Sequence, residues 1–322
     1  MCRIQKEYGE DYLSATCATY PRVTSRLDGL LETALALSCP EAARLVLLDP
    51  QLVTADVGES RYGRLLSLQD HGNGSESALR SFWEIREFSL LLVRDRSYPL
   101  WQRVFLLGMF CRRLDEIAFG RQFWSVPMLV REYAGIIAGG ELRAAMDGIP
   151  VRAGVQINMV MEVVQSYLRR QDQTLSRMRE CLEDFLHGTG YVDAAPPLEH
   201  CTRAYLEAYD RYYAPFMEQH PFLLENYLVN HIFQTQFPFG QKWVSDQEGP
   251  LRNYLLMSVE LAAMKGLLIG TAGHYGEAFG TEQVVKVVQA FTKSVEHSQI
   301  FRAALNWQGL ADMNSVAALL KN

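Results

Sequence analysis

The chain has 322 residues, of which 48% are hydrophobic and 21% are charged, as in ordinary globular proteins. Its formal net charge of −6 removes the electrostatic basis for binding nucleic acid or an anionic membrane surface. No apolar run is long enough to span a bilayer, and the N-terminal residues lack the apolar core of a secretion signal. The sequence therefore predicts a cytoplasmic protein that binds neither nucleic acid nor membrane.

The N-terminal stretch, residues 1–72, is irregular and carries three of the six cysteines. Cys17 and Cys39 each lie close to a proline, where the chain changes direction, and Cys2 begins a short helical pattern. Turns suit metal ligands because thiolates point inward while backbone N–H groups face the sulfur. However, the spacing matches no zinc ribbon or knuckle, and most free intracellular cysteines are small buried residues. Both interpretations remain open for these three cysteines.

Helical periodicity dominates the rest of the chain. Residues 76–96 repeat apolar side chains at i, i+3 and i+4, and residues 97–120 open on serine and proline and close on Gly120. Further helical stretches, separated by proline and glycine, cover residues 153–188, 198–219, 221–237, 249–270 and 281–306. Three cysteines lie within these helical patterns and are expected to be buried residues with no catalytic or metal-binding role: Cys111, Cys181 and Cys201.

Alternation with a period of two, typical of strands, is nearly absent, and residues 44–57 are the one weak candidate. The sequence predicts an all-α protein. A multi-helix body over residues 73–322 would follow a short, irregular, cysteine-bearing module over residues 1–72.

Two pairs of segments resemble one known protein family. CRIQKEYGEDYLSATCATYPR (residues 2–22) and ALSCPEAARLVLL (residues 36–48) are similar to the cysteine-bearing region of the flagellin lysine-N-methylase family. ENYLVNHIFQTQFPFG (residues 225–240) and VEHSQIF (residues 295–301) are similar to later signatures of that family. The resemblance covers almost the whole chain, and its specific parts are the cysteine segments and ENYLVN…FPF.

The resemblance implies a cytoplasmic enzyme that methylates lysine side chains of flagellin, with S-adenosylmethionine as the methyl donor. It also implies an iron–sulfur cluster held by N-terminal cysteines, and Cys2, Cys17 and Cys39 fall on cysteines of that module. Family members carry further cysteines upstream, so the chain resembles a member that lacks its N-terminal cysteine-containing segment. Because a cluster usually has four thiolate ligands, water or a partner must supply the missing one, or the chain binds no cluster.

The helix expected over ENYLVNHIFQ is the candidate wall of a methylation site. Asn226, Asn230 and Gln234 repeat at i, i+4 and i+8 and form one amide row, which we predict to bind substrate or donor. Glu225 and Tyr227 flank this row and are the predicted catalytic residues, accepting a proton or orienting the substrate amine. Such help is needed because free lysine has a pKa of about 10.4 and must be neutral to attack a methyl group. The alternative is that these amides cap neighbouring helices or hydrogen-bond across a core.

The sequence does not locate the donor site. Gly188-Thr-Gly190 superficially resembles a glycine-rich donor loop, but it follows a helical pattern and no βαβ unit surrounds it. A helix C-cap followed by a turn is the expected structure there.

Two other functions remain compatible with the sequence. A non-catalytic, cysteine-ligated metal-binding helical protein would use its metal for stability and not for turnover. A helical flagellin-binding module would bind its partner with neither metal nor methylation.

Overall fold

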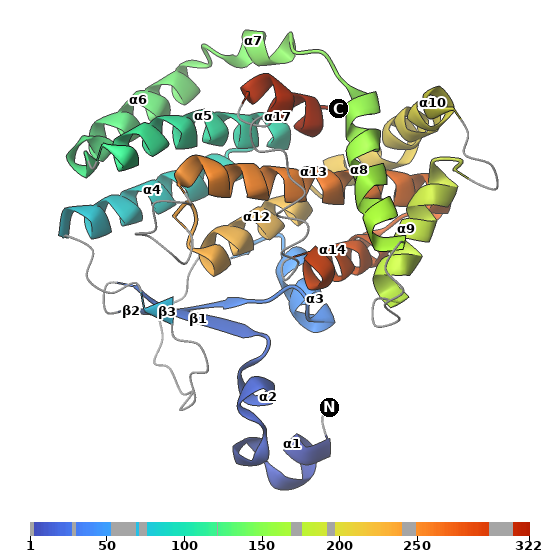
Figure 1. The fold of residues 1–322 in the computed structure, drawn as a ribbon, viewed down its shortest axis with the longest axis horizontal. Helices are drawn as coiled ribbons and strands as arrows, with labels where there is room; N and C mark the ends of the chain where they lie inside the picture. The colour runs from blue at the N-terminus through green and yellow to red at the C-terminus, as the bar shows by residue number, and fades with distance from the viewer. Residues whose placement is uncertain are drawn as a thin grey trace.

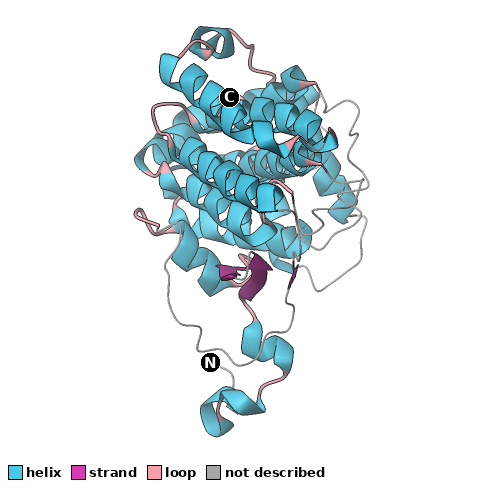
Figure 2. Cartoon of the chain, turned by 90° about the vertical axis from the view of Figure 1, so that its left-hand side faces the viewer, coloured by secondary structure: helices cyan, strands magenta, loops and turns pink. Residues whose placement is uncertain are grey.

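The computed structural model describes residues 3–27, 30–52, 69–70, 76–120, 122–168, 176–191, 197–239, 249–295 and 312–322. Over these residues it is a helical body with a small sheet and short helices extending below it (Figures 1 and 2), so the all-α fold class is confirmed. The N-terminal elements are α1 (Arg3–Tyr8), η1 (Glu10–Tyr12), α2 (Ala15–Thr19), β1 (Arg22–Leu27), β2 (Leu30–Leu35), α3 (Pro40–Leu47) and β3 (Gln69–Asp70). The body contains α4 (Glu76–Arg94), α5 (Leu100–Phe119), η2 (Phe123–Ser125), α6 (Val126–Gly139), α7 (Arg143–Asp147), α8 (Ala153–Leu168), α9 (Ser176–Gly188), α10 (Leu198–Ala208), η4 (Tyr209–Tyr213), α11 (Ala214–Gln219), α12 (Phe222–Thr235), α13 (Pro250–Tyr275), η5 (Gly276–Ala278), α14 (Thr281–Val295) and α17 (Met313–Leu320).

Helix α13 is the central element of the body (Figure 1), and α5, α8, α9, α10, α14 and α17 all pack against it. Helix α9 packs closely against it. A side chain at Gly188 of α9 would overlap the carbonyl oxygen of Gly270 of α13, so only glycine fits at this contact. By length and hydropathy, Pro250–Ala278 is the one described segment suited to cross a membrane, but 89% of its apolar window is buried in the body, as in a core helix.

The predicted helices agree with the structure except at two places. The run 153–188 is described as two helices, α8 and α9, and residues 169–175 between them lie outside the described residues. The run 198–219 contains a π-helical turn, η4, between α10 and α11. The end of the predicted helix 281–306 and the boundary between residues 72 and 73 also lie outside the described residues.

The strand expected within residues 44–57 is absent from the described part of that range, because α3 covers residues 44–47 and residues 48–52 form no strand, while residues 53–57 lie outside the described residues. Before this range, β1 and β2 form an antiparallel hairpin, and after it β3 pairs in parallel with β1. Most β2 side chains are exposed or half-buried, so this strand lacks the alternation of apolar and polar residues that identifies strands in sequence.

Three body helices hold the hairpin and α3 in place. Arg86 of α4, only 3% exposed, pairs with Glu32 of β2 at 2.6 Å. Gln289 of α14 donates to the Ser38 carbonyl at 2.7 Å, just before α3 begins. Helix α12 contributes the third attachment through the side chains of Asn226 and Asn230.

The last carbonyls of α3 have no partner within the helix itself, and Asn226 of α12 satisfies them. Its Nδ2 donates to the carbonyl oxygens of Val46 at 3.0 Å and of Asp49, just beyond α3, at 2.7 Å. One turn later, Asn230 Nδ2 donates to the Leu35 carbonyl of β2 at 2.9 Å. Because these groups are largely buried, losing the donor leaves desolvated carbonyls unpaired.

Replacing Asn226 with alanine is therefore expected to lower the free energy of unfolding by about 1–3 kcal/mol, measured by urea unfolding. Gln234→Ala is the matched control. Its oxygen accepts one hydrogen bond from Asn230, at 3.3 Å, so it should change stability by about 0.5 kcal/mol or less. Equal stability of wild type and Asn226→Ala would contradict this role for the amide.

Candidate functional site

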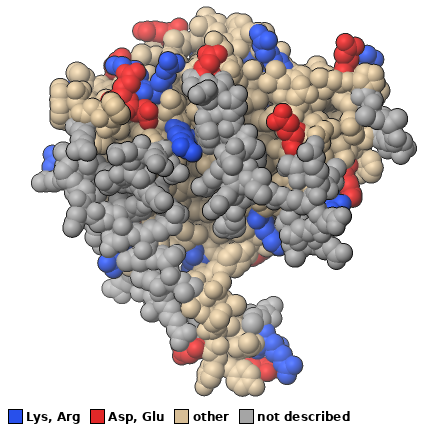
Figure 3. All heavy atoms as spheres, viewed as in Figure 1, with Lys and Arg blue, Asp and Glu red and all other residues tan. Residues whose placement is uncertain are grey.

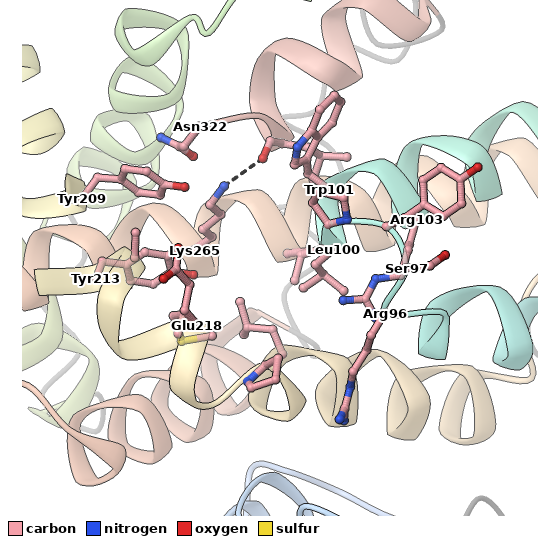
Figure 4. Close-up of a pocket in the computed structure, with 18 residues that line it drawn as sticks. Arg96, Ser97, Leu100, Trp101, Arg103, Tyr209, Tyr213, Glu218, Lys265 and Asn322 are labelled. Carbon is pink, nitrogen blue, oxygen red and sulfur yellow. Dashed lines mark hydrogen bonds between the residues drawn. The ribbon is translucent and has the colours of Figure 1, made fainter. Parts of the chain in front are cut away.

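A pocket of ≈ 440 Å³ opens between the start of α5, the η4–α11 segment, the first turn of α12 and the middle of α13. Figure 4 shows how these elements face one another around it. The lining residues are Arg96, Ser97, Tyr98, Pro99, Leu100, Trp101, Arg103, Tyr209, Tyr213, Ala214, Met217, Glu218, Pro221, Leu224, Leu261, Lys265, Leu320 and Asn322. The volume lies within the range of about 300–1,000 Å³ that is usual for small-molecule sites.

Aromatic side chains form much of the wall. The π-helical turn η4 presents Tyr209 and Tyr213 to the pocket, with their ring centroids 5.7 Å apart. Trp101 of α5 lines it as well. Burial raises the pKa of both tyrosines, so their phenols remain neutral at physiological pH. Single π-helical turns within α-helices are frequent at functional sites, because they re-aim side chains.

Lys265 of α13 is a cationic side chain in this mostly apolar wall. Its Nζ donates to the Leu320 carbonyl at 2.8 Å and lies 5.7 Å from the ring centroid of Tyr209. Burial lowers the pKa of Lys265 to about 7. No carboxylate among the described residues pairs with it.

A buried ion cluster borders the opposite end of the pocket. Glu225 of α12, 3% exposed, accepts from Arg96 Nε at 3.0 Å and Nη2 at 2.9 Å, and from Arg103 Nη1 at 2.9 Å. Two guanidinium groups and one carboxylate leave a net positive charge. Arg103 Nε is buried and has no hydrogen-bond partner among the described residues.

The side chains that the sequence singled out on α12 are not part of the wall of this pocket. Glu225 is joined to the pocket only through its two arginines, and Tyr227, 2% exposed, belongs to the hydrophobic core. Asn226 and Asn230 face α3 and β2, and Gln234 accepts from Asn230. Their predicted roles in catalysis and binding stay predictions.

The predicted metal ligands are only partly described. Cys17 is exposed on α2 and Cys39, half-buried, immediately precedes α3, whereas Cys2 lies outside the described residues. Their two segments meet where the Tyr20 hydroxyl lies 3.4 Å from that of Ser38. Within the described ranges, no three His, Cys, Asp or Glu side chains are placed to hold a metal ion. A ligand set that includes Cys2 thus stays a prediction.

The remaining cysteines behave as expected. Cys111, Cys181 and Cys201 are all buried, and burial raises the pKa of Cys181 to about 12. They are therefore unreactive thiols.

Sequence patterns alone did not identify the pocket. In the sequence, Lys265 is a lone charged residue in the apolar run LAAMKGLLIG, a pattern that indicates an unusual environment. The cluster YDRYY, residues 209–213, was a second signal. On the face in Figure 3, acidic and basic residues are interspersed and mark no particular site.

Comparisons with known proteins agree with the resemblance. The model of the FliB lysine N-methylase C-terminal domain matches residues 86–321. Lysine-N-methylases of Salmonella typhimurium and Salmonella choleraesuis are each 24% identical over 325 residues, covering 92% of this chain and 72% of the relative. The flagellar biosynthetic protein FliU of Salmonella muenchen is 34% identical over 61 residues, covering 19% of this chain and 35% of that protein.

No solved structure matches the chain. Every residue that lines the pocket except Asn322 lies within the stretch that matches the family model. The match covers well over half of the sequence, and the chain belongs to the FliB lysine N-methylase family.

Proposed function

We propose that this chain is a cytoplasmic protein-lysine N-methyltransferase that modifies flagellin and uses S-adenosylmethionine as methyl donor at the pocket. The observation that carries this proposal is that the family match, residues 86–321, contains nearly the entire wall of an aromatic pocket of ≈ 440 Å³. The names of the relatives support lysine methylation, and the flagellar name of one of them supports flagellin as the substrate.

The wall residues fit the chemistry of the donor. S-adenosylmethionine supplies an electrophilic methyl group on a sulfonium, and it also carries an adenine ring and a zwitterionic amino-acid end. The face of Trp101 offers a stacking surface for a ring and a cation–π partner for a positive group. The carboxylate of Glu218 suits an ammonium group, and the positively charged edge formed by Arg96 and Arg103 suits a carboxylate.

The pocket also suits the acceptor lysine. Apolar and aromatic walls exclude water, and desolvation lowers the pKa of an incoming amine toward the neutral form that reacts. Neutral phenols at Tyr209 and Tyr213 surround a cation without the cost of a buried countercharge. Holding the amine in line with the methyl group then supplies much of the rate.

Flagellin co-expressed with the wild-type chain is expected to gain whole methyl groups on lysine, measured by intact mass and peptide mapping. Trp101→Ala removes an aromatic wall of the pocket and should reduce methylation about tenfold or more. Trp124→Ala, at a tryptophan of η2 that is 75% exposed, is the matched control and should leave it unchanged.

Flagellin of unchanged mass, beside a wild-type chain that is folded, would refute the proposed activity. If that chain still bound flagellin, it would be a binding module. An equal loss of methylation in Trp101→Ala and Trp124→Ala would contradict the assignment of the reaction to this pocket.

We also propose that Cys17 and Cys39 contribute ligands to an iron–sulfur cluster. The support is that their segments meet at one end of the hairpin, where the Ala36 amide donates to the Pro21 carbonyl at 2.8 Å. Both thiols are exposed or half-buried, unlike the three buried cysteines of the helical body. Thiolate ligation is the usual way in which proteins hold such clusters.

Cys17→Ser is expected to lose most of its bound iron and acid-labile sulfide, measured on protein purified without oxygen. Cys201→Ser, at a buried cysteine of α10, should keep both. Iron and sulfide contents that do not differ between wild type and Cys17→Ser would exclude Cys17 as a ligand. A chelator that lowers the melting temperature but leaves turnover unchanged would identify the metal as purely structural.

A further inference from the structure

Lys265 is a charged residue of the pocket wall for which the described residues provide no carboxylate partner. Between Glu260 and His274 it is the only charged residue of α13, and its Nζ reaches the wall near Tyr209 and Trp101 (Figure 4). A lysine that only filled space would normally extend its ammonium group into water. Here the side chain is turned inward and ends on a backbone carbonyl, that of Leu320, at 2.8 Å.

The groups around Lys265 do not stabilise its ammonium form by charge. The adjoining π-helical turn contributes two neutral phenols, Tyr209 and Tyr213. Helix α11 contributes Glu218, an exposed residue that forms no ion pair with Lys265.

Other charged side chains near the pocket do not pair with Lys265 either. From the α5 side, Arg96 and Arg103 share the single carboxylate of Glu225. Lys321 lies over the ring of Trp101, 5.0 Å from its centroid. Burial without a paired anion lowers the pKa of Lys265 to about 7, so a large fraction of this side chain is a neutral amine at physiological pH.

We infer that Lys265 is the proton acceptor of the methylation reaction, taking a proton from the ammonium group of the incoming lysine. This inference rests on the proposed function and goes beyond it, because it assigns the reaction a base. A lysine that is partly neutral near pH 7 and lines a largely apolar pocket has the properties that general-base catalysis requires.

The proton and the electrons balance as follows. One N–H bond of the substrate ammonium breaks and its electron pair remains on the substrate nitrogen, while the Lys265 lone pair forms a new N–H bond. The substrate nitrogen then bonds to the methyl carbon of the sulfonium donor, and the electron pair of the C–S bond stays on sulfur. The Leu320 carbonyl accepts a hydrogen bond from the newly charged Lys265, which afterwards releases its proton to water.

Lys265→Arg keeps a long cationic side chain that cannot accept a proton, and Lys265→Met keeps an unbranched chain without the amine. Both are expected to reduce the methylation rate about 100-fold or more and to remove the rise in rate as pH increases through about 7. Binding of S-adenosylhomocysteine and the melting temperature should remain close to wild type. These two measurements distinguish the loss of proton transfer from the loss of donor binding or of the folded structure.

Lys286→Met is the matched control. Lys286 lies on α14 and pairs with Asp184 at 3.2 Å, away from the pocket wall. This variant should keep the rise in rate near neutral pH. A Lys265→Arg enzyme with wild-type rate and pH profile would overturn the inference while leaving the methyltransferase proposal intact.

A second measurement does not depend on turnover. The full chain, without donor or flagellin, is acetylated with a limiting amount of acetic anhydride over a range of pH. Mass spectrometry of its peptides then gives, for each lysine, the pH at which the acetylation rate is half of its maximum. Lys265 should titrate near 7, well below the exposed lysines. A midpoint near 10, or methyl groups accumulating on Lys265 itself during turnover, would overturn its role as base. A midpoint near 7 in a chain that methylates nothing would instead refute the proposed function, and the base with it.

Discussion

The carboxylate of Glu225 lies buried between the guanidinium groups of Arg96 and Arg103 and holds α12 against the turn that joins α4 to α5. A buried charge is strongly unfavourable unless it is paired, so these three side chains keep their positions only together. Removing one partner from such a pair typically costs about 3–5 kcal/mol. Because both arginines line the pocket, this cluster fixes one edge of it and leaves that edge positively charged.

Helix α12 carries a second constraint directly beside the first. Asn226 and Asn230 hold the C-terminal end of α3 and the edge strand β2, so the same helix joins the N-terminal module to the pocket. The motif ENYLVN therefore has a physical explanation in hydrogen bonds and ion pairs. Its side chains hold the neighbouring elements in place, while Pro221, directly before α12, and Leu224, in its first turn, contribute to the pocket wall.

Much of the helical body was predictable because its helices are long and amphipathic, and their caps are visible in the sequence. Helix α5 ends at Phe119, directly before the predicted terminal Gly120. The hairpin was not predictable, because a small, mostly exposed sheet leaves no regular apolar alternation. The amide row on α12 was recognised, but its hydrogen-bond partners, Val46 and Leu35, are far away in sequence and belong to elements that only the fold brings close.

The pocket depends on the same kind of long-range contact. Its walls come from residues near 100, 210, 220, 265 and 320, which no local pattern connects. Lys265 is the exception, since a single lysine in a long apolar helix already indicates an unusual environment. The sequence therefore indicates one unusual residue of the site, Lys265, whereas the position of the pocket follows only from the fold.

Photochemical cross-linking of radiolabelled S-adenosylmethionine to the whole chain, followed by peptide mapping, tests most directly whether this pocket holds the donor. Label is expected on peptides that contain Trp101 or the Tyr209–Tyr213 turn, and excess unlabelled S-adenosylhomocysteine should abolish it. Specific label confined to the α12 segment from Asn226 to Gln234, or to the N-terminal module, would contradict the account and place donor binding on the other side of α12.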